Sequence, residues 1–311
     1  MRPSLAVLFL CAGFGKRLAP LTEHIPKPLL PFLGRTALEI NKQKIDKLKK
    51  YFTITKMVCN THHLAPLVVD RACKLGIEPI HENVLLGTGG CISNAIAHLG
   101  SPDYLLVHNG DILHTVDLLA FCHSALQHKG RVAGHLVGIS FEKVNSLLVD
   151  KRGILKGIKN YWPQDKYACK PEGVSGVKDD KTGLTYSGIA LYHKSFFKYC
   201  ENRIADIKPF WVKAIEAGEK IVVQDYSGVS WHDFGTPQSL WDTMKWRMEK
   251  QGEYSFNYPK SKKLAFVSNE GEVQKTPDNL SNIIIYEKPS VPLYKGMHHQ
   301  IIGENFKWEI Q

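Results

Sequence analysis

The sequence predicts an α/β fold in which helices cover a mostly parallel β-sheet. Residues 5–10 form a continuous apolar run, which is typical of a strand buried on both faces. Strand-like segments and segments with helical spacing of apolar residues then alternate through the first half of the chain, as in successive β-α-β units. A chain of 311 residues is long enough for one large domain, or for one domain with an appendage, and too short for three.

The expected elements of the first half follow one another in a regular order. After the strand at 5–10 we expect a helix at 36–51, a strand at 56–60, a helix at 64–75 that ends at Gly76, a strand at 77–80, a helix that ends at Gly100, and a strand at 104–107. Asp117 is placed to cap the next helix, whose apolar face is Leu118, Phe121, Cys122 and Ala125.

Short strands and turns replace this rhythm between residues 132 and 192, and a loop rich in Gly, Asp and Lys interrupts them at 171–183. The remaining expected elements are a helix at 209–218, strands at 221–225 and 229–231, and a helix that begins at Thr236 and Pro237. Trp241, Met244 and Met248 form the expected buried stripe of that last helix.

The C-terminal segment has a different pattern, so we expect two parts, residues 1–254 and a tail at 255–311. Asn282-Ile283-Ile284 and Gln300-Ile301-Ile302 match at a separation of 18 residues, and Ile285, Val291 and Met297 recur every six. A six-residue period is typical of a β-helix. Only one or two coils fit, so this partial β-helix must dock on the main domain or pair subunits in a homo-oligomer. A coincidental pair of strands is the alternative.

Composition restricts the function classes. The formal charge of +10 predicts solubility and attraction to anions, but no nucleic-acid-binding signature is present. No apolar run approaches the roughly 18 residues of a membrane helix, and the apolar start lacks a small-residue cleavage site. The seven scattered cysteines contain no Cys-x-x-Cys, which argues against a zinc site or a disulfide framework and favours a reducing cytoplasm.

A glycine-rich, cationic loop follows the first strand. Gly13 and Gly15 let backbone N–H groups approach phosphate oxygens, and Arg17 and Lys27 can grip two different phosphates. The loop lacks the spacing of a Walker P-loop, and it lacks the third glycine of a dinucleotide fingerprint. The sequence therefore predicts a phosphate site of another kind.

The Gly-x-Gly-x-Arg-Leu loop followed by Pro-Lys-Pro resembles the signature of the sugar-1-phosphate nucleotidylyltransferases. Three further stretches agree in the family's order, and the resemblance covers about residues 5 to 245: Leu86-Gly87-Thr88-Gly89-Gly90, Asn109-Gly110-Asp111 and Asp233-Phe234-Gly235-Thr236-Pro237. Each stretch alone has a structural alternative, such as a turn cap at Asp111 or a helix entry at Asp233. The four together favour the family.

The resemblance implies a Rossmann-like, mostly parallel mixed sheet with helices on both faces. The tail resembles the partial left-handed β-helix that some relatives carry. It implies a nucleoside triphosphate and a sugar 1-phosphate as substrates, with Mg²⁺ held by Asp111 and Asp233. Arg17 would contact the β- and γ-phosphates, and Lys27 the α-phosphate and the incoming phosphate. The nucleotide would lie against Leu10, Ala12, Gly13, Gly15, Gly87 and Thr88, and the sugar phosphate against Gly110, Lys159, Ser187 and Gly188.

The resemblance leaves the substrates open. The Leu-Gly-Thr-Gly-Gly stretch looks most like guanylyltransferases that act on mannose or heptose 1-phosphate, so we expect GTP. Residues 185–193 instead look like uridylyltransferases that act on N-acetylmuramic acid 1-phosphate. A non-catalytic regulator that binds nucleotide sugars is a third alternative. The family's mid-chain Glu-Lys-Pro is absent, and Lys159 is the candidate replacement for its cation, because the Glu-Lys-Pro at 287–289 lies in the tail.

Overall fold

A computed structural model of the chain describes residues 2–128, 132–141, 144, 146–162 and 183–249, and the strand segments 265–268, 281–286, 298–302 and 307–309. The interior of the loop expected at 171–183, the side chain of Met248 and much of the tail lie outside the described residues.

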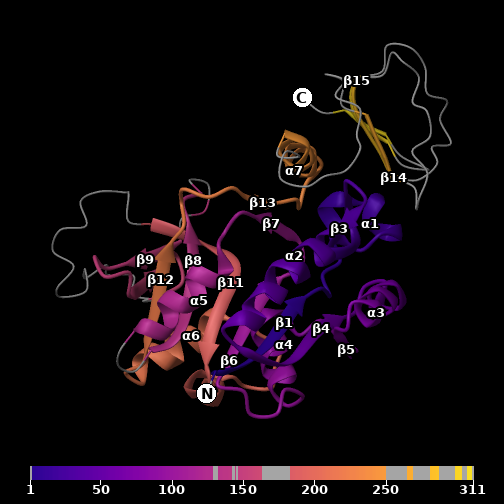
Figure 1. Ribbon diagram of the computed structural model, residues 1–311. Helices are drawn as coiled ribbons and strands as arrows, with labels where there is room; N and C mark the ends of the chain where they lie inside the picture. The colour runs from indigo at the N-terminus through magenta and orange to yellow at the C-terminus, as the bar shows by residue number, and fades with distance from the viewer. Residues whose placement is uncertain are drawn as a thin grey trace.

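A mixed nine-stranded sheet forms the centre of the molecule (Figure 1). Seven strands run in the order β10-β9-β11-β6-β1-β4-β5, and β8 pairs with both β11 and β12. The neighbours β4 and β6 pair in parallel with β1, whereas β11 is antiparallel to β6, β8 and β9. The strands are β1 (Ser4–Leu10), β4 (Thr53–Thr61), β5 (Glu78–His81), β6 (Tyr104–Asn109), β8 (Val132–Ile139), β9 (Leu147–Val149), β10 (Leu155–Ile158), β11 (Gly183–His193) and β12 (Lys220–Asp225).

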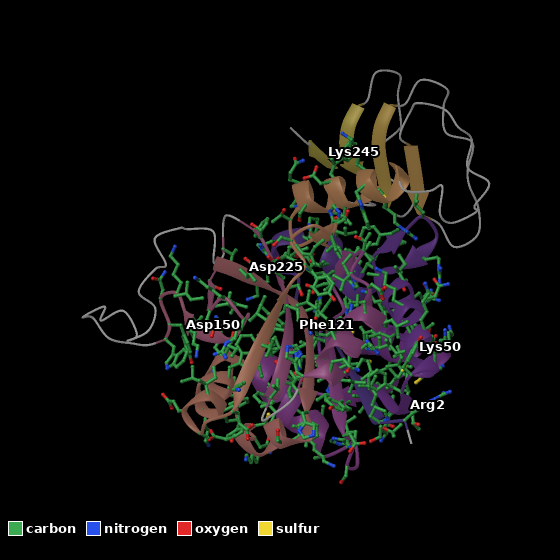
Figure 2. The ribbon with its side chains drawn as sticks, turned by 60° about the vertical axis from the view of Figure 1, so that its left-hand side comes forward. Arg2, Lys50, Phe121, Asp150, Asp225 and Lys245 are labelled. Carbon is green, nitrogen blue, oxygen red and sulfur yellow. The ribbon has the colours of Figure 1, made fainter. Side chains whose placement is uncertain are left out.

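Helices cover both faces of this sheet, as predicted. Successive residues of β1 point to opposite faces: Ala6 and Leu8 belong to one buried cluster, and Val7 and Phe9 to another. The first cluster contains residues of α4 and α6, and the second contains residues of α2, α3 and α5. Figure 2 shows Phe121 of α5 inside the body of the protein. The helices are α2 (Ala37–Asp46), α3 (Ala65–Lys74), α4 (Gly87–Ile96), α5 (Leu118–Gln127), α6 (Lys208–Glu216) and the short α1 (Leu21–His24).

The helix caps predicted at Asp117 and Thr236 are confirmed, and the structure adds a further cap at Thr36. Thr36 and Glu39 form a capping box at the start of α2, and Asp117 accepts hydrogen bonds from the first turn of α5. Thr236 stands just before α7 (Pro237–Glu249), and its Oγ1 accepts a hydrogen bond from Ser239 N at 3.2 Å. The helix expected at 36–51 ends at Asp46 and continues as the 3₁₀ helix η3 (Lys47–Lys50).

A two-stranded ribbon lies beside the main sheet. Strand β7 (Ile112–His114) pairs antiparallel with β13 (Trp231–Asp233), and Figure 1 shows α7 above them. The last strand was expected at 229–231 and instead begins at Trp231, because its pairing with His114 determines where the ribbon starts. A third apolar cluster, which includes Leu18, Phe234 and Met244, joins this region to the glycine-rich loop.

The tail contains paired strands. β14 (Ala265–Ser268), β15 (Ser281–Tyr286) and β16 (His298–Ile302) pair in parallel, and β17 (Lys307–Glu309) pairs antiparallel with β16. Ile283 pairs with Ala265 on one side and with Gln300 on the other. These intervals of 18 and 17 residues are close to the three hexads of one coil. The β-helix, the domain boundary at 254 and the role in assembly remain predictions. Among the described residues, no helix has the length and apolar character needed to cross a membrane.

The stretch from Leu86 to Gly90 leads directly into a helix, because Gly87 to Gly90 form the first turn of α4. The N–H groups of Gly89 and Gly90 both donate to the carbonyl of Ala205, at 2.9 and 3.2 Å. A Cβ on Gly90 would lie 2.3 Å from Arg203 O, which is a backbone atom. The glycines therefore allow residues 203–206 to pack directly on the start of α4.

Gly90→Ala should destabilise the fold, because a methyl group cannot fit against the Arg203 carbonyl. We expect the free energy of unfolding to fall by about 1–3 kcal/mol in chemical denaturation. Gly228→Ala is the matched control, since no atom lies within 4 Å of the added Cβ. Equal stability of the two variants would contradict the close packing.

Several histidines are buried in neutral form. Burial lowers the pKa of His108 to about 3 and that of His135 to about 3, and it places the pKa of His114 well below its usual value. The ring of His114 accepts from Val116 N through Nδ1, so its Nε2 carries the proton and donates to His108 Nε2 at 3.0 Å. His108 Nδ1 then donates to the carbonyl of Asn109 at 2.7 Å.

Stability should therefore fall with acidification. An unfolded histidine binds a proton below a pH of about 6.5, whereas these buried rings stay neutral until a much lower pH, so protons favour the unfolded chain. Each such ring adds a slope of about 1.4 kcal/mol per pH unit between its two pKa values. His135→Gln should flatten the measured dependence between pH 6 and 4 by about one such slope. His98→Gln, which changes an exposed ring, should leave it unchanged.

Candidate functional site

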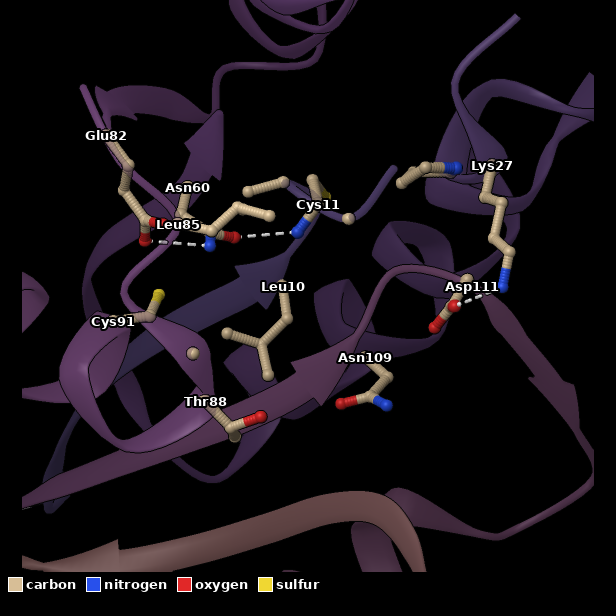
Figure 3. A pocket seen from close by; sticks show the side chains of 14 residues that line it. Leu10, Cys11, Lys27, Asn60, Glu82, Leu85, Thr88, Cys91, Asn109 and Asp111 are labelled. Atoms are coloured by element: carbon tan, nitrogen blue, oxygen red, sulfur yellow. Dashed lines mark hydrogen bonds and ion pairs between the residues drawn. The ribbon is translucent and has the colours of Figure 1, made fainter. Parts of the chain in front are cut away.

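A pocket of about 270 Å³ opens where β1 and β6 end and α4 begins (Figure 3). In parallel strands these carboxyl ends lie at the same edge of the sheet, which is the usual ligand position in such folds. Seven of the predicted site residues line the pocket: Leu10, Ala12, Gly13, Lys27, Gly87, Thr88 and Asp111. Cys11, Pro28, Asn60, Glu82, Leu85, Cys91 and Asn109 complete the lining.

Lys27 and Asp111 form an ion pair at one end of the pocket. Lys27 Nζ lies 3.1 Å from Asp111 Oδ2, and the lysine is only 9% exposed (Figure 3). Lys27 begins the short helix η2 (Lys27–Leu29), and Asp111 follows β6. A buried ammonium is held in position by such a carboxylate, so the cation is oriented toward the pocket.

Asp233, at the end of β13, is close enough to Lys27 and Asp111 for their charges to act on its carboxyl group. Burial raises the pKa of its carboxyl group, and the negative charge of Asp111 raises it further, while Lys27 and Arg17 act in the opposite direction. A Cβ on Gly235 would lie 2.6 Å from a guanidinium nitrogen of Arg17 and 2.8 Å from Asp233 Oδ1. The predicted aspartates therefore converge, and Arg17 joins them across Gly235.

The glycine-rich loop is braced from outside the pocket. Gly15 has φ of +67°, and its carbonyl accepts a hydrogen bond from Thr22 Oγ1 at 3.0 Å. His63 Nε2 in turn donates to the carbonyl of Thr22 at 2.6 Å. Gly15 does not line the pocket. Its positive φ instead allows the chain to turn between Gly13 and Arg17.

The residues predicted to bind the sugar phosphate fall into two groups. Gly110 lies beside the pocket, where a Cβ would meet Leu10 O and Cys11 Sγ, each at 2.8 Å. Gly188 has φ of +87°, and a Cβ there would lie 2.6 Å from the side chain of Asn109, which lines the pocket. Ser187 precedes it, and its buried Oγ has no hydrogen-bond partner among the described residues. A β-bulge at this point of β11 directs these two residues toward the end of β6.

Lys159 lies elsewhere. It follows β10 at the far side of the sheet, is exposed, and its backbone N–H donates to Ser146 O at 2.7 Å. It does not line the pocket. Its assignment as the substitute cation stays a prediction.

Sequence reasoning missed a polar chain at the other end of the pocket. Asn60 Oδ1 accepts from Cys11 N at 2.7 Å, and Asn60 Nδ2 donates to Glu82 Oε1 at 2.9 Å (Figure 3). Glu82 Oε2 accepts from Leu86 N at 3.1 Å, and the residue is 2% exposed. A carboxylate five residues before the Gly87 turn was the available signal, because such a group needs donors when it lies in a pocket or a core.

The donor set fits a magnesium ion. Mg²⁺ prefers oxygen ligands and is commonly held by one or two carboxylates together with substrate phosphates and water. Asp111 and Asp233 supply two carboxylates, and within the described part of the chain no cluster of three or more His, Cys, Asp or Glu forms a complete protein-only site. The arrangement is thus suited to an ion that arrives with a phosphorylated substrate.

Comparisons with known proteins agree with this geometry. Residues 6–146 match the family described as nucleotidyl transferase. The N-acetylmuramate alpha-1-phosphate uridylyltransferase of Neisseria meningitidis serogroup B is 26% identical over 244 residues, which cover 75% of this chain and 94% of that protein. The catalytic subunit beta of mannose-1-phosphate guanylyltransferase from Drosophila pseudoobscura pseudoobscura is 25% identical over 239 residues, which cover 75% of this chain and 60% of that protein.

The fold has solved counterparts as well. HddC from Yersinia pseudotuberculosis, in a crystal structure complexed with GMP-PN, gives a TM-score of 0.58 at 19% identity over 79% of this chain and 99% of that one. That likeness concerns the fold, whereas the family match and the two relatives concern the sequence. Together they support the resemblance of this chain to the sugar-1-phosphate nucleotidylyltransferases, which are enzymes.

Proposed function

We propose that the chain joins a nucleoside triphosphate to a sugar 1-phosphate, with release of pyrophosphate and formation of a nucleotide sugar. A phosphate oxygen of the sugar 1-phosphate attacks the α-phosphorus, and the bond from that phosphorus to the pyrophosphate oxygen breaks. The observation that carries this proposal is that Lys27 and Asp111 pair at the wall of the pocket and that the charges of both act on Asp233, which does not line the pocket itself.

The attacking group is already an anion, so the protein has little proton transfer to catalyse. It must instead hold two repelling anions in line. Lys27, kept in place by Asp111, is positioned for the α-phosphate and the incoming phosphate. Arg17, beside Gly235 and Asp233, is positioned for the β- and γ-phosphates. Backbone groups of Gly13 and of the Gly87 turn offer N–H donors on the nucleotide side.

Mg²⁺ is the proposed cofactor, with Asp111 and Asp233 as its protein ligands. When bound, it would neutralise phosphate charge as the transferred group passes between oxygens. It would also remove the repulsion between the two carboxylates that raises the pKa of Asp233.

Asp111→Asn tests the reaction and the metal assignment together. The variant keeps the shape of the side chain but loses its charge, so we expect the Mg²⁺-dependent release of pyrophosphate to fall by at least about 100-fold. Asp70→Asn is the control, because this exposed carboxylate is paired with Lys74 on the outside of α3. Survival of near-wild-type release in Asp111→Asn would show that the assignment is wrong.

We propose GTP as the nucleotide, with mannose or heptose 1-phosphate as the acceptor. Guanine presents two adjacent donors, N1–H and N2–H, whereas uracil presents one. Glu82 provides carboxylate oxygens at the pocket wall, and each oxygen has a second lone pair beyond the bonds from Asn60 and Leu86. The pocket thus has acceptor capacity that suits guanine.

Glu82→Gln should reduce the preference for GTP. An amide cannot accept both guanine donors, so we expect the ratio of kcat/KM for GTP to that for UTP to fall by about 10-fold or more. The ratio is the informative measurement, because general damage to the Asn60–Glu82 chain would lower both values. An unchanged ratio would mean that Glu82 only supports the pocket.

The alternative substrate pair is UTP with an N-acetylated sugar 1-phosphate. The Neisseria meningitidis relative, whose name specifies N-acetylmuramate 1-phosphate and uridylyl transfer, favours it. A pyrophosphate-release screen that crosses five nucleoside triphosphates with a panel of sugar 1-phosphates separates the two pairs. Absence of turnover with every pair, together with nucleotide-sugar binding, would identify the non-catalytic regulator.

A further inference from the structure

Two neighbouring histidines contact the glycine-rich loop from outside the pocket. His62 and His63 come directly after Thr61, the last residue of β4. Neither lines the pocket, yet both rings pack against the loop that contributes to its wall. The proposed reaction assigns no role to either residue.

The first contact is made by an aromatic side chain of the loop. The Phe14 ring packs against both histidine rings, with centroid distances of 5.4 Å to His62 and 5.4 Å to His63. Lys16 Nζ lies 5.4 Å from the centroid of the same ring. Phe14 is 40% exposed, so these contacts hold the loop at the surface rather than fill a core.

The second contact is a relay of two hydrogen bonds. His63 Nε2 donates to the carbonyl of Thr22 at 2.6 Å, and Thr22 Oγ1 donates to the carbonyl of Gly15 at 3.0 Å. The Gly15 carbonyl also accepts from Leu18 N at 2.8 Å. A trans peptide holds its C=O and its N–H on opposite sides, so a fixed Gly15 carbonyl also fixes the direction of the Lys16 N–H.

Thr22 is packed where a shift would reach the phosphate-binding side chains. It belongs to α1 and is 2% exposed. A Cβ on Gly15 would lie 2.8 Å from Thr22 Cγ2 and 3.2 Å from Lys27 Cγ, so these three residues are in close contact. Displacement of Thr22 would therefore move the turn that leads to Arg17 and would open space beside Lys27.

The backbone after His63 has an uncommon conformation. Leu64 has φ of +49°, in the left-handed region that a residue with a Cβ seldom adopts. Its carbonyl accepts from Leu67 N at 3.0 Å as α3 begins. Such strain persists only where the surrounding structure imposes it. Here it allows the chain to turn from β4 into α3 directly after His63.

We propose that His63 is a positioning residue for the nucleotide and acts through Thr22. The relay holds the turn between Gly13 and Arg17 in the form that receives the β- and γ-phosphates, so the triphosphate does not have to order this turn when it binds. This role rests on the proposed function, because it takes the triphosphate to lie against the glycine-rich loop.

Nucleotide affinity measured without turnover tests this role. Calorimetry on the full-length chain with Mg²⁺, and without any sugar phosphate, gives Kd for GTP, UTP, GMP and UMP. His63→Leu keeps an apolar side chain but loses the donor, so we expect affinity for the tighter-binding triphosphate to fall by about 10-fold, as for one lost hydrogen bond. Affinity for the matching monophosphate, which lacks the β- and γ-phosphates, should stay nearly unchanged.

Three further variants separate positioning from general damage. His63→Gln carries an amide N–H near the position of the imidazole Nε2–H, so it should restore most of the affinity. Thr22→Val removes the hydroxyl of the relay and keeps the shape of the side chain, so it should weaken triphosphate binding in the same way. The double variant of His63→Leu with Thr22→Val should lose little more than either single variant, because both changes break one path.

Thr243→Val is the matched control. Thr243 is buried in α7, and its Oγ1 donates to the carbonyl of Ser239 at 2.6 Å. The variant loses a comparable hydroxyl far along the chain from the relay, so it should leave the affinities for triphosphate and monophosphate unchanged.

Three results would overturn the proposal: an equal loss of affinity for triphosphate and monophosphate, failure of His63→Gln to restore binding, or additive losses in the double variant. Absence of binding of either triphosphate to the wild-type chain would overturn both the relay and the reaction. Binding without pyrophosphate release for any sugar phosphate would overturn the reaction alone, because the affinities decide the role of His63 independently.

Discussion

The site depends on two carboxylates, Asp111 and Asp233, that the fold holds near each other although their negative charges repel. Burial raises the pKa of the Asp233 carboxyl group, the negative charge of Asp111 raises it further, and Lys27 and Arg17 act in the opposite direction. Such an arrangement is unfavourable for the folded chain alone, so the surrounding structure must impose it. Pairing of β7 with β13 does this, because it ties the segment after Asp111 to the segment that ends at Asp233. In the proposed reaction, a divalent cation and the substrate phosphates bind to charged groups that the fold has already brought together.

The ribbon of β7 and β13 also leads away from the pocket, toward buried residues beside α5 and α7. Strand β7 follows Asp111 directly and ends at His114. Helix α7 begins just after Thr236, near Asp233, and continues past Trp246. Inside, the proton order of the buried histidines is determined by Val116 N: His114 donates to His108, and His108 donates to the carbonyl of Asn109. Because both rings stay neutral, this chain joins β7 to the Asn109 turn through directional hydrogen bonds rather than through charge.

The sequence predicted the alternation of strands and helices and the caps at Asp117 and Thr236, because these depend on local periodicity and capping chemistry. Helices on both faces of the sheet were expected from the family resemblance. It also singled out the residues that converge at the pocket, through motif resemblance. It could not reveal why Gly89 and Gly90 are glycines, because the reason is the carbonyls of Arg203 and Ala205, more than a hundred residues away. Asn60 and Glu82 were missed for a similar reason: each is an ordinary polar residue until β4 and β5 pair and place them side by side.

The structure shows where some of the cations behind the net charge of +10 lie. Some of these cations form ion pairs on α2 and α3, as in Lys42 with Asp46 and Lys74 with Asp70. Such surface pairs contribute little to the stability of the fold. Lys27 instead lies at the pocket, where it is paired with one carboxylate, Asp111. Unbalanced positive charge inside low-dielectric walls attracts small anions more strongly than the same charge spread over a surface. The proposed reaction has substrates and a leaving group that are all phosphorylated, so it suits this distribution of positive charge.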